Sequence, residues 1–414
     1  MSISIGELIV QAEAAMGPLG HAPSTRMQYR WAWSQFARFC SRDAVDEFSE
    51  EAVAAFVEFV AAEHRAARMK EWKHKLLRKA TLVLSEVART GSYEWSLSRT
   101  AHPNDALSAV FRPVQEQFEL WLQGQSLAAA TQNLYATVSR TALAWLPDRG
   151  VKNAQALSGS DVSAMVVFLG SRYQPGSMRT VVSALRVLCR FLEESGYGTG
   201  LSRAVPALFA RRVASVGVLS AEGVAALFNS PDVTTAVGLR DRALLLLGAR
   251  TGLRPVDIAG LRLRDIDWQH AQLTLTQHKT GSVVTLPLLA EVGEAISDYL
   301  LNGRRAGGDD DHVFLRSHAP YVGLGPTDSL YWVASRAFAR SGAVTQNGTG
   351  RGFRVLRASF ATRLLADGTP LPVISGALGH RGITSAKHYL SADEIHMRAC
   401  CLDFSGIEPK RTWS

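Results

Sequence analysis

The sequence predicts a mainly α-helical protein with one small β-sheet in its C-terminal half. Residues 1 to about 210 carry apolar side chains at helical spacing and show almost no strand pattern. Residues 271–288, "AQLTLTQHKTGSVVTLPL", instead alternate apolar and polar residues on either side of a Lys-Thr-Gly turn, which is typical of a β-hairpin. Helical patterns resume after it, so the C-terminal half is expected to be an α+β domain.

The N-terminal half is predicted to contain two related helical bundles in tandem. "STRMQYRWAWSQFARFC" begins at Ser24, "AAATQNLYATVSRTALAWL" begins at Ala128, and each is followed by an apolar helix and then a basic stretch. Ser24 and Thr25 are the expected cap of the first helix. Residues 202–217 hold a Pro and a basic pair and are interpreted as a linker. The predicted domains are residues 1–105, 106–205 and 213–414.

Composition favours a polyanionic partner. The chain has 414 residues, a net charge of +8 and a pI of about 9.5, which indicates nucleic acid first and a membrane surface second; a basic protein with no such partner is the alternative. The apolar stretch Ala243–Ala249 is too short to span a bilayer. The four cysteines lack metal-ligand spacing, and no basic leader precedes an apolar run, so we expect a cytoplasmic protein with reduced thiols.

Two stretches concentrate basic residues with few acids, and each is predicted to be a helix that binds DNA phosphates. A solvated charged face with no ligand is the alternative. They are residues 61–80, with Arg65, Arg68, Lys70, Lys73, Lys75, Arg78 and Lys79, and residues 172–190, with Arg172, Arg179, Arg186 and Arg190.

The C-terminal half holds cations at positions that suit chemistry. In "ARTGLRPVDIAGL", Gly252 is expected to end one helix and Pro255 to begin the next, which puts Arg254 at a helix N-terminus, where anions are favoured and where Asp257 could orient it. Lys279 lies at the tip of the predicted hairpin. A surface Arg and a solvated Lys are the ordinary alternatives.

Four more candidates follow along the chain. Arg354 and Arg357 are three residues apart near a helix start, so they share a face. His380 follows a short helix that Gly379 closes, and Tyr389 lies in a further helix capped by Thr384 or Ser385.

Together these residue types suit phosphodiester chemistry. Arginines can neutralise the non-bridging oxygens, Tyr can attack phosphorus, and Lys can protonate the leaving oxygen. The sequence has no Walker loop, no Gly-x-Ser-x-Gly and no carboxylate pair for sugar hydrolysis, and the acidic stretch at residues 302–312 is interpreted as an exposed loop rather than a metal site.

The order of these motifs resembles the catalytic domain of tyrosine recombinases, the phage integrase family, over about residues 213–404. The resemblance implies that Arg254 and Arg357 clamp the scissile phosphate, that Lys279 protonates the 5′ oxygen, that His380 assists, and that Tyr389 forms a 3′-phosphotyrosine without metal or ATP. Arg354 stands where the family usually has His or Lys, and Ala358 where it often has His. These departures suggest a transposon-type or element-borne enzyme.

The resemblance also implies partners. It predicts a tetramer on two double-stranded DNA duplexes, at the bacterial nucleoid, with an accessory protein as a further candidate partner. Ile395, Ala399, Leu402 and Phe404 form an apolar stripe that would pack on its own domain or on a neighbouring protomer. A type IB topoisomerase or telomere resolvase, and a non-catalytic DNA-binding regulator of the same fold, are the alternative functions.

Overall fold

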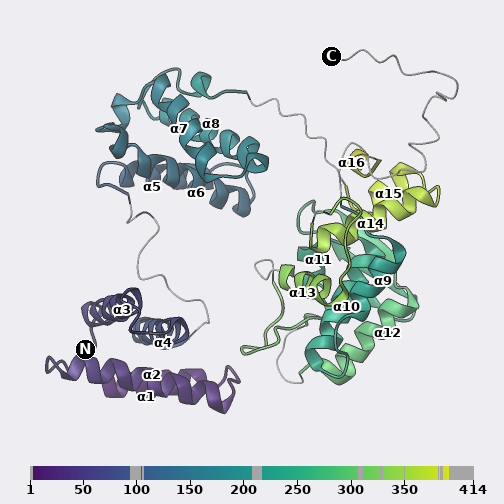
Figure 1. Cartoon of the computed structure of the whole chain (residues 1–414), viewed down its shortest axis with the longest axis horizontal. Helices are drawn as coiled ribbons and strands as arrows, with labels where there is room; N and C mark the ends of the chain where they lie inside the picture. The colour runs from purple at the N-terminus through teal and green to yellow at the C-terminus, as the bar shows by residue number, and fades with distance from the viewer. Residues whose placement is uncertain are drawn as a thin grey trace, which may run out of the picture. The chain divides into compact units, whose positions relative to one another are not determined.

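The protein is mainly α-helical with one small sheet, as the sequence predicts (Figure 1). A computed structural model describes residues 3–93, 104, 107–207, 217–305, 311–325, 330–348, 350–380, 382 and 386–390. The predicted caps Thr384 and Ser385 and the apolar stripe after Tyr389 lie outside these residues. Within them, no helix combines the length and apolar character that a membrane span needs.

The N-terminal segment packs four helices around aromatic residues. They are α1 (Ile5–Met16), α2 (Pro23–Ser41), α3 (Glu50–Arg65) and α4 (Glu71–Thr90). Trp33 and Phe36 of α2 are buried, and the Trp33 indole N–H donates to the Ala80 carbonyl at 2.8 Å, which ties α2 to α4. The expected cap is wrong: Pro23 occupies the first turn of α2 and Ala22 precedes it, so Ser24 already lies inside the helix.

The predicted single basic helix at residues 61–80 is also wrong. α3 ends at Arg65, Ala67 adopts a left-handed conformation (φ 57°), and α4 begins at Glu71. The break lets α4 turn back and pack against α3. The basic residues of this stretch therefore lie on the end of one helix, a turn and the start of another.

The second segment repeats the four-helix arrangement around its own core. It contains α5 (Arg112–Gln123), α6 (Ala129–Trp145), α7 (Gly159–Arg172) and α8 (Met178–Glu194), and its core includes the buried Phe118, Leu143 and Leu188. The predicted basic helix at residues 172–190 is divided too, because α7 ends at Arg172 and a turn that starts at Pro175 precedes α8.

The C-terminal segment surrounds the apolar helix α10 (Ala236–Thr251) with other helices (Figure 1). α10 packs against α9 (Ala221–Asn229), α12 (Ala290–Asp298), α13 (Tyr331–Ser341) and α14 (Phe353–Ala366). Helices on several sides explain why α10 is apolar around most of its circumference.

The predicted hairpin is confirmed as part of a three-stranded antiparallel sheet. β1 (Ile266–Asp267) pairs with β2 (Gln272–Thr276), and β2 pairs with β3 (Val283–Pro287). Leu273 lies opposite Leu286 and Leu275 opposite Val284, and all four side chains are buried. The alternation in the sequence therefore fixes which face of the sheet packs against the core.

A small apolar cluster holds the last helices together. α14, α15 (Leu371–Ala377) and α16 (Lys387–Leu390) contribute to it. Ala361, Ile374 and Leu378 are fully buried there, and the Tyr389 ring is 5% exposed. This packing determines where the side chains at residues 357, 380 and 389 can lie.

Candidate active site

Arg254 lies where the chain turns sharply from α10 into α11 (Pro255–Ala259). Gly252 ends α10 in the left-handed region (φ 64°), and a Cβ there would lie 2.6 Å from the Phe360 ring, so both the turn and the packing require glycine. Pro255 takes the first helical position, and Arg254 is the residue just before it. Both predicted helix boundaries are confirmed.

The Arg254 guanidinium is largely buried. Its side chain is 17% exposed, and Nη1 donates to Oε1 of Gln277 and lies 3.9 Å from Oδ2 of Asp257. Burial, and then the nearby charge of Arg357, lowers the pKa of Arg254, whereas Asp257 and Tyr389 oppose that shift. Two cations whose charges interact in a desolvated site favour an anion beside them.

Asp257 connects α11 to the hairpin. Its side chain is fully buried, and Oδ1 accepts the backbone N–H of His278 at 2.8 Å. Burial raises the pKa of the Asp257 carboxyl, and the His278 N–H and the charges of Arg254 and Arg357 oppose this. The carboxylate thus fixes the start of the hairpin turn and faces Arg254.

Arg357 enters the same region from α14 and is 8% exposed. Nη1 donates to the Gly252 carbonyl at 2.7 Å, and Nη2 donates to the Leu378 carbonyl at 3.0 Å and to Nε2 of His380 at 2.8 Å. Three of the five guanidinium N–H groups therefore hold the side chain in one orientation. Because an arginine N–H only donates, Nε2 of His380 is the acceptor.

His380 and Tyr389 stack beside the two arginines. Gly379 is left-handed (φ 60°) after α15, and the His380 N–H donates to the Ser375 carbonyl at 2.9 Å, which closes the turn. The His380 and Tyr389 rings are nearly parallel, with centroids 6.3 Å apart and planes 9° apart. The two rings, nine positions apart in the sequence, therefore lie face to face.

The structure brings four of the six predicted catalytic residues into one place: Arg254, Arg357, His380 and Tyr389. Lys279 lies on the turn between β2 and β3 with its side chain exposed. Arg354 is exposed one turn before Arg357.

Sequence reasoning missed Gln277. Its side chain is completely buried, and it contacts both Arg254 and the Leu378 carbonyl. A signal was present, because Leu273 and Leu275 face inward from β2 and Gln277, the first residue after the strand, continues the same period of two. A polar residue at such a position needs hydrogen-bond partners inside the protein.

The predicted DNA-binding residues differ in how free they are to contact phosphate. Arg65, Arg68 and Lys75 form ion pairs with Glu58, Glu63 and Glu71. Lys73 lies 5.4 Å from the Trp31 ring, and Lys79 is half-buried near Tyr29, where desolvation lowers the pKa of its ammonium. Arg186 donates to the carbonyls of Val205 and Pro206. The side chains of Lys70, Arg78, Arg179 and Arg190 are exposed, and so is that of Arg172, which lies 5.2 Å from the Phe168 ring.

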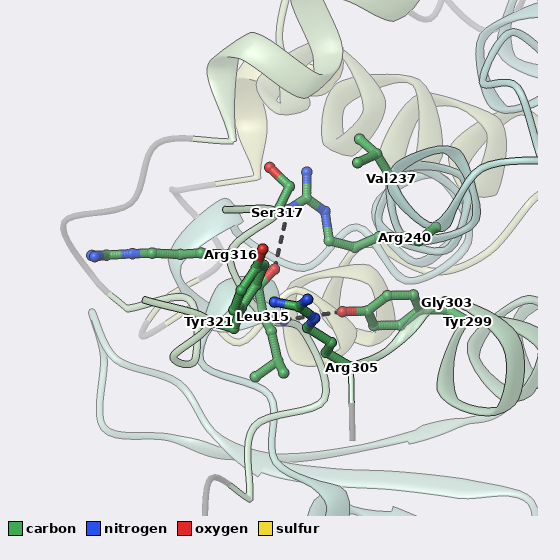
Figure 2. A pocket seen from close by; sticks show the side chains of 10 residues that line it. Val237, Arg240, Tyr299, Gly303, Arg305, Leu315, Arg316, Ser317 and Tyr321 are labelled. Atoms are coloured by element: carbon green, nitrogen blue, oxygen red, sulfur yellow. Dashed lines mark hydrogen bonds between the residues drawn. The ribbon is translucent and has the colours of Figure 1, made fainter. Parts of the chain in front are cut away.

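A cavity of about 240 Å³ lies elsewhere, between the start of α10 and residues 315–321 (Figure 2). Arg240 donates to the Leu315 carbonyl at 3.1 Å and pairs with Asp241 at 2.7 Å. Arg305 lies 4.1 Å from the Tyr321 ring. Arg240 and Arg305, which line this cavity, thus already contact protein groups. The predicted catalytic residues do not line the cavity. The described residues contain no group of three or more His, Cys, Asp or Glu arranged to hold a metal ion.

Known proteins are similar to this chain in sequence. Residues 218–396 match the phage integrase family. "Putative integrase/recombinase y4gC" of Sinorhizobium fredii is 38% identical over 46% of this chain and 97% of that protein. "Tyrosine recombinase XerD" of Lacticaseibacillus casei is 30% identical over 66% of this chain and 92% of that protein.

The fold is also that of a lambda integrase crystallised as a tetramer bound to a Holliday junction. The match has a TM-score of 0.51 at 18% identity and covers 82% of this chain and 89% of that one. The chain belongs to the phage integrase family and is a tyrosine recombinase, a DNA strand transferase of site-specific recombination.

Proposed function

We propose that Tyr389 is the nucleophile of this recombinase and that Arg254 and Arg357 clamp the scissile phosphate. The observation that carries the proposal is the pair of guanidinium groups, Arg357 buried and Arg254 largely buried, beside the stacked His380 and Tyr389 rings. Planar guanidinium groups suit the two non-bridging oxygens of a phosphodiester. A phosphate between them would also offset their mutual repulsion.

In the cleavage step, the Tyr389 hydroxyl oxygen attacks phosphorus as the bond from phosphorus to O5′ breaks. The phenol loses its proton, O5′ gains one, and a 3′-phosphotyrosine forms. We assign the proton for O5′ to Lys279, whose ammonium is carried on the hairpin turn. Attack by the 5′-hydroxyl of a partner strand reverses the step, so the phosphotyrosine ester conserves the energy needed for joining.

His380 and Arg354 have supporting roles in this proposal. His380 would hydrogen-bond the phosphate or assist proton transfer; because its Nε2 accepts from Arg357, the neutral ring carries its proton on Nδ1. Arg354 keeps a positive charge near the start of α14, but its guanidinium cannot act as a base. We therefore assign it to an outer phosphate contact.

We further propose three domains, at residues 1–105, 106–205 and 213–414, because each holds a hydrophobic core of its own. The two N-terminal bundles would grip double-stranded DNA opposite the catalytic domain. The exposed cations of α4 and α8, and Lys70 just before α4, would supply phosphate contacts, which depend little on DNA sequence.

Neutralising Lys70, Arg78, Arg179 and Arg190 together by Gln is expected to weaken binding to many DNA sequences alike. The slope of log affinity against log salt should fall by up to about four units, one for each lost phosphate contact. Fluorescence anisotropy over a salt series measures both. Lys75→Gln is the control: because Glu71 already pairs with Lys75, this change should leave the slope nearly unchanged. An unchanged slope in the fourfold variant would assign these residues to another purpose.

The proposed assembly is a tetramer on two duplexes, which acts at the bacterial nucleoid to integrate, excise or transpose a mobile element. Recombination of two duplexes cuts four strands, which needs four copies of Tyr389. The lambda integrase tetramer on a Holliday junction supports this by fold alone. An accessory protein is a further proposed partner.

A two-site plasmid assay tests this function, with sites taken from the ends of the DNA segment that carries the gene. Recombined circles formed without ATP are the expected result. Relaxation of plasmids that lack the sites would instead favour a type IB topoisomerase. Binding without any covalent adduct would favour a DNA-binding regulator.

A further inference from the structure

Gln277 is a buried polar residue that contacts three predicted motifs: the Lys279 hairpin turn, Arg254, and the turn before His380. It follows the last residue of β2, and its side chain is 0% exposed. Its backbone N–H donates to the Ser282 carbonyl at 2.9 Å, and its carbonyl accepts from the Gly281 N–H at 2.8 Å. Gln277 therefore forms the base of the turn that carries Lys279.

The side-chain amide of Gln277 uses both of its ends. Oε1 accepts from Nη1 of Arg254 and from the Thr280 hydroxyl at 3.1 Å, and Nε2 donates to the Leu378 carbonyl at 3.2 Å. The planar amide of a Gln accepts at one end and donates at the other. A carboxylate would lose the donor, and a thioether would lose both functions.

The Leu378 carbonyl is shared with the other arginine. It accepts from Nη2 of Arg357 at 3.0 Å, while Nη1 of Arg357 donates to the Gly252 carbonyl at 2.7 Å, two residues before Arg254. Arg254, Gln277, Leu378, Arg357 and Gly252 thus form a closed chain of bonds. The two arginines are linked through one amide as well as through the backbone.

The turn before His380 is shaped to admit this amide. A Cβ on Gly379 would lie 2.2 Å from Oε1 of Gln277, so any other residue at this position would displace the side chain. The left-handed φ of 60° at Gly379 adds a second requirement for glycine. The Gly379 position thus serves the hairpin as well as the His380 turn.

We propose that Gln277 is a positioning residue that couples the Lys279 turn to the arginine pair. The proposal rests on the proposed function of Tyr389, Arg254 and Lys279. A rigid amide bonded to both would set the distance between the phosphate clamp and the proton donor. Without it, Arg357 keeps its contacts with the Gly252 and Leu378 carbonyls, but Arg254 loses its hydrogen bond to the base of the hairpin turn.

Single-turnover cleavage by the full-length protein on two substrates tests the coupling. One is an ordinary nicked duplex, and the other carries sulfur in place of the bridging 5′ oxygen. A thiolate leaves without a proton, because thiols are far more acidic than alcohols. Gln277→Met is expected to lower the rate on the ordinary substrate by about tenfold to a hundredfold, with a clearly smaller loss on the sulfur substrate.

The controls separate this proposal from the proposed function. Lys279→Ala should be rescued by the sulfur substrate; if it is not, the role of Lys279 fails, whatever Gln277 does. Gln272→Met makes the same change on the exposed side of β2 and should leave both rates unchanged. DNA affinity and melting temperature are measured for each variant, to detect lost binding or lost stability. A merely structural role of Gln277 would lower the cleavage rates on the two substrates equally.

Two results would overturn the proposal: an unchanged rate in Gln277→Met, or an equal loss on both substrates. If Gln277→Met does not fold, Gln277→Glu decides the question by the same comparison. It keeps the length of the side chain and the acceptor for Arg254 and Thr280, replaces the donor to Leu378 by a second acceptor, and adds a negative charge.

Discussion

Replacing Tyr389 by Phe is expected to abolish covalent attachment to DNA and to leave DNA affinity nearly unchanged. Phe keeps the ring that packs in the cluster with Ala361 and Leu378 and stacks beside His380. It removes only the hydroxyl oxygen that attacks phosphorus. Denaturing gels with a nicked suicide substrate report the adduct, and a gel-shift titration reports affinity.

A matched control uses another tyrosine of the same domain. Tyr331 begins α13 and is 53% exposed. Tyr331→Phe also removes one hydroxyl, yet it should form the adduct at the normal rate. An adduct formed by Tyr389→Phe at the wild-type rate would rule out Tyr389 as the nucleophile.

Arg254→Ala and Arg357→Ala should each reduce the single-turnover cleavage rate by at least about a hundredfold, comparable to the loss of one oxyanion donor. Arg254→Ala removes the nearest cation from the buried Asp257, and Arg357→Ala leaves the Gly252 and Leu378 carbonyls without its N–H groups. Part of the effect can therefore be on stability. Lys at each position keeps the charge and loses the planar fork. The melting temperatures of the Ala and Lys variants separate the effect on stability from the effect on the cleavage step.

Arg354→His provides the contrast to these variants. Arg354 is exposed on α14, at the position where the resemblance to the family implies His or Lys. We expect cleavage by Arg354→His to stay closer to the wild-type rate than cleavage by Arg357→Ala. Equal damage in the two variants would show that Arg354 is not a variant of the family's His position.

Local signals in the sequence explain why much of the site could be predicted. Gly252 and Pro255 define a helix end and a helix start within four residues, and that geometry places Arg254. The alternation around Lys279 defines the hairpin. Gly379 closes α15 just before His380. Each of these depends on neighbours in the chain, which is the information that a sequence pattern contains.

Features that depend on distant contacts were missed. Gln277 has partners 23 and 101 residues away, and sequence spacing alone cannot pair them. The break after Arg65 occurs in an Ala-rich stretch with no Gly or Pro, because packing of α4 against α3 outweighs the local helix preference. The break after Arg172 did carry a Pro-Gly signal at residues 175–176, and the charge pattern obscured it.

The central claim is the covalent linkage, and mapping the attached residue tests it most directly. The wild-type protein is trapped on a nicked suicide substrate and digested with protease, and the peptide that carries the nucleotide is sequenced by mass spectrometry. The account predicts a single adduct on Tyr389, joined to a 3′ phosphate, with a free 5′-hydroxyl on the released strand. Attachment through another residue, or through a 5′ phosphate, would contradict it.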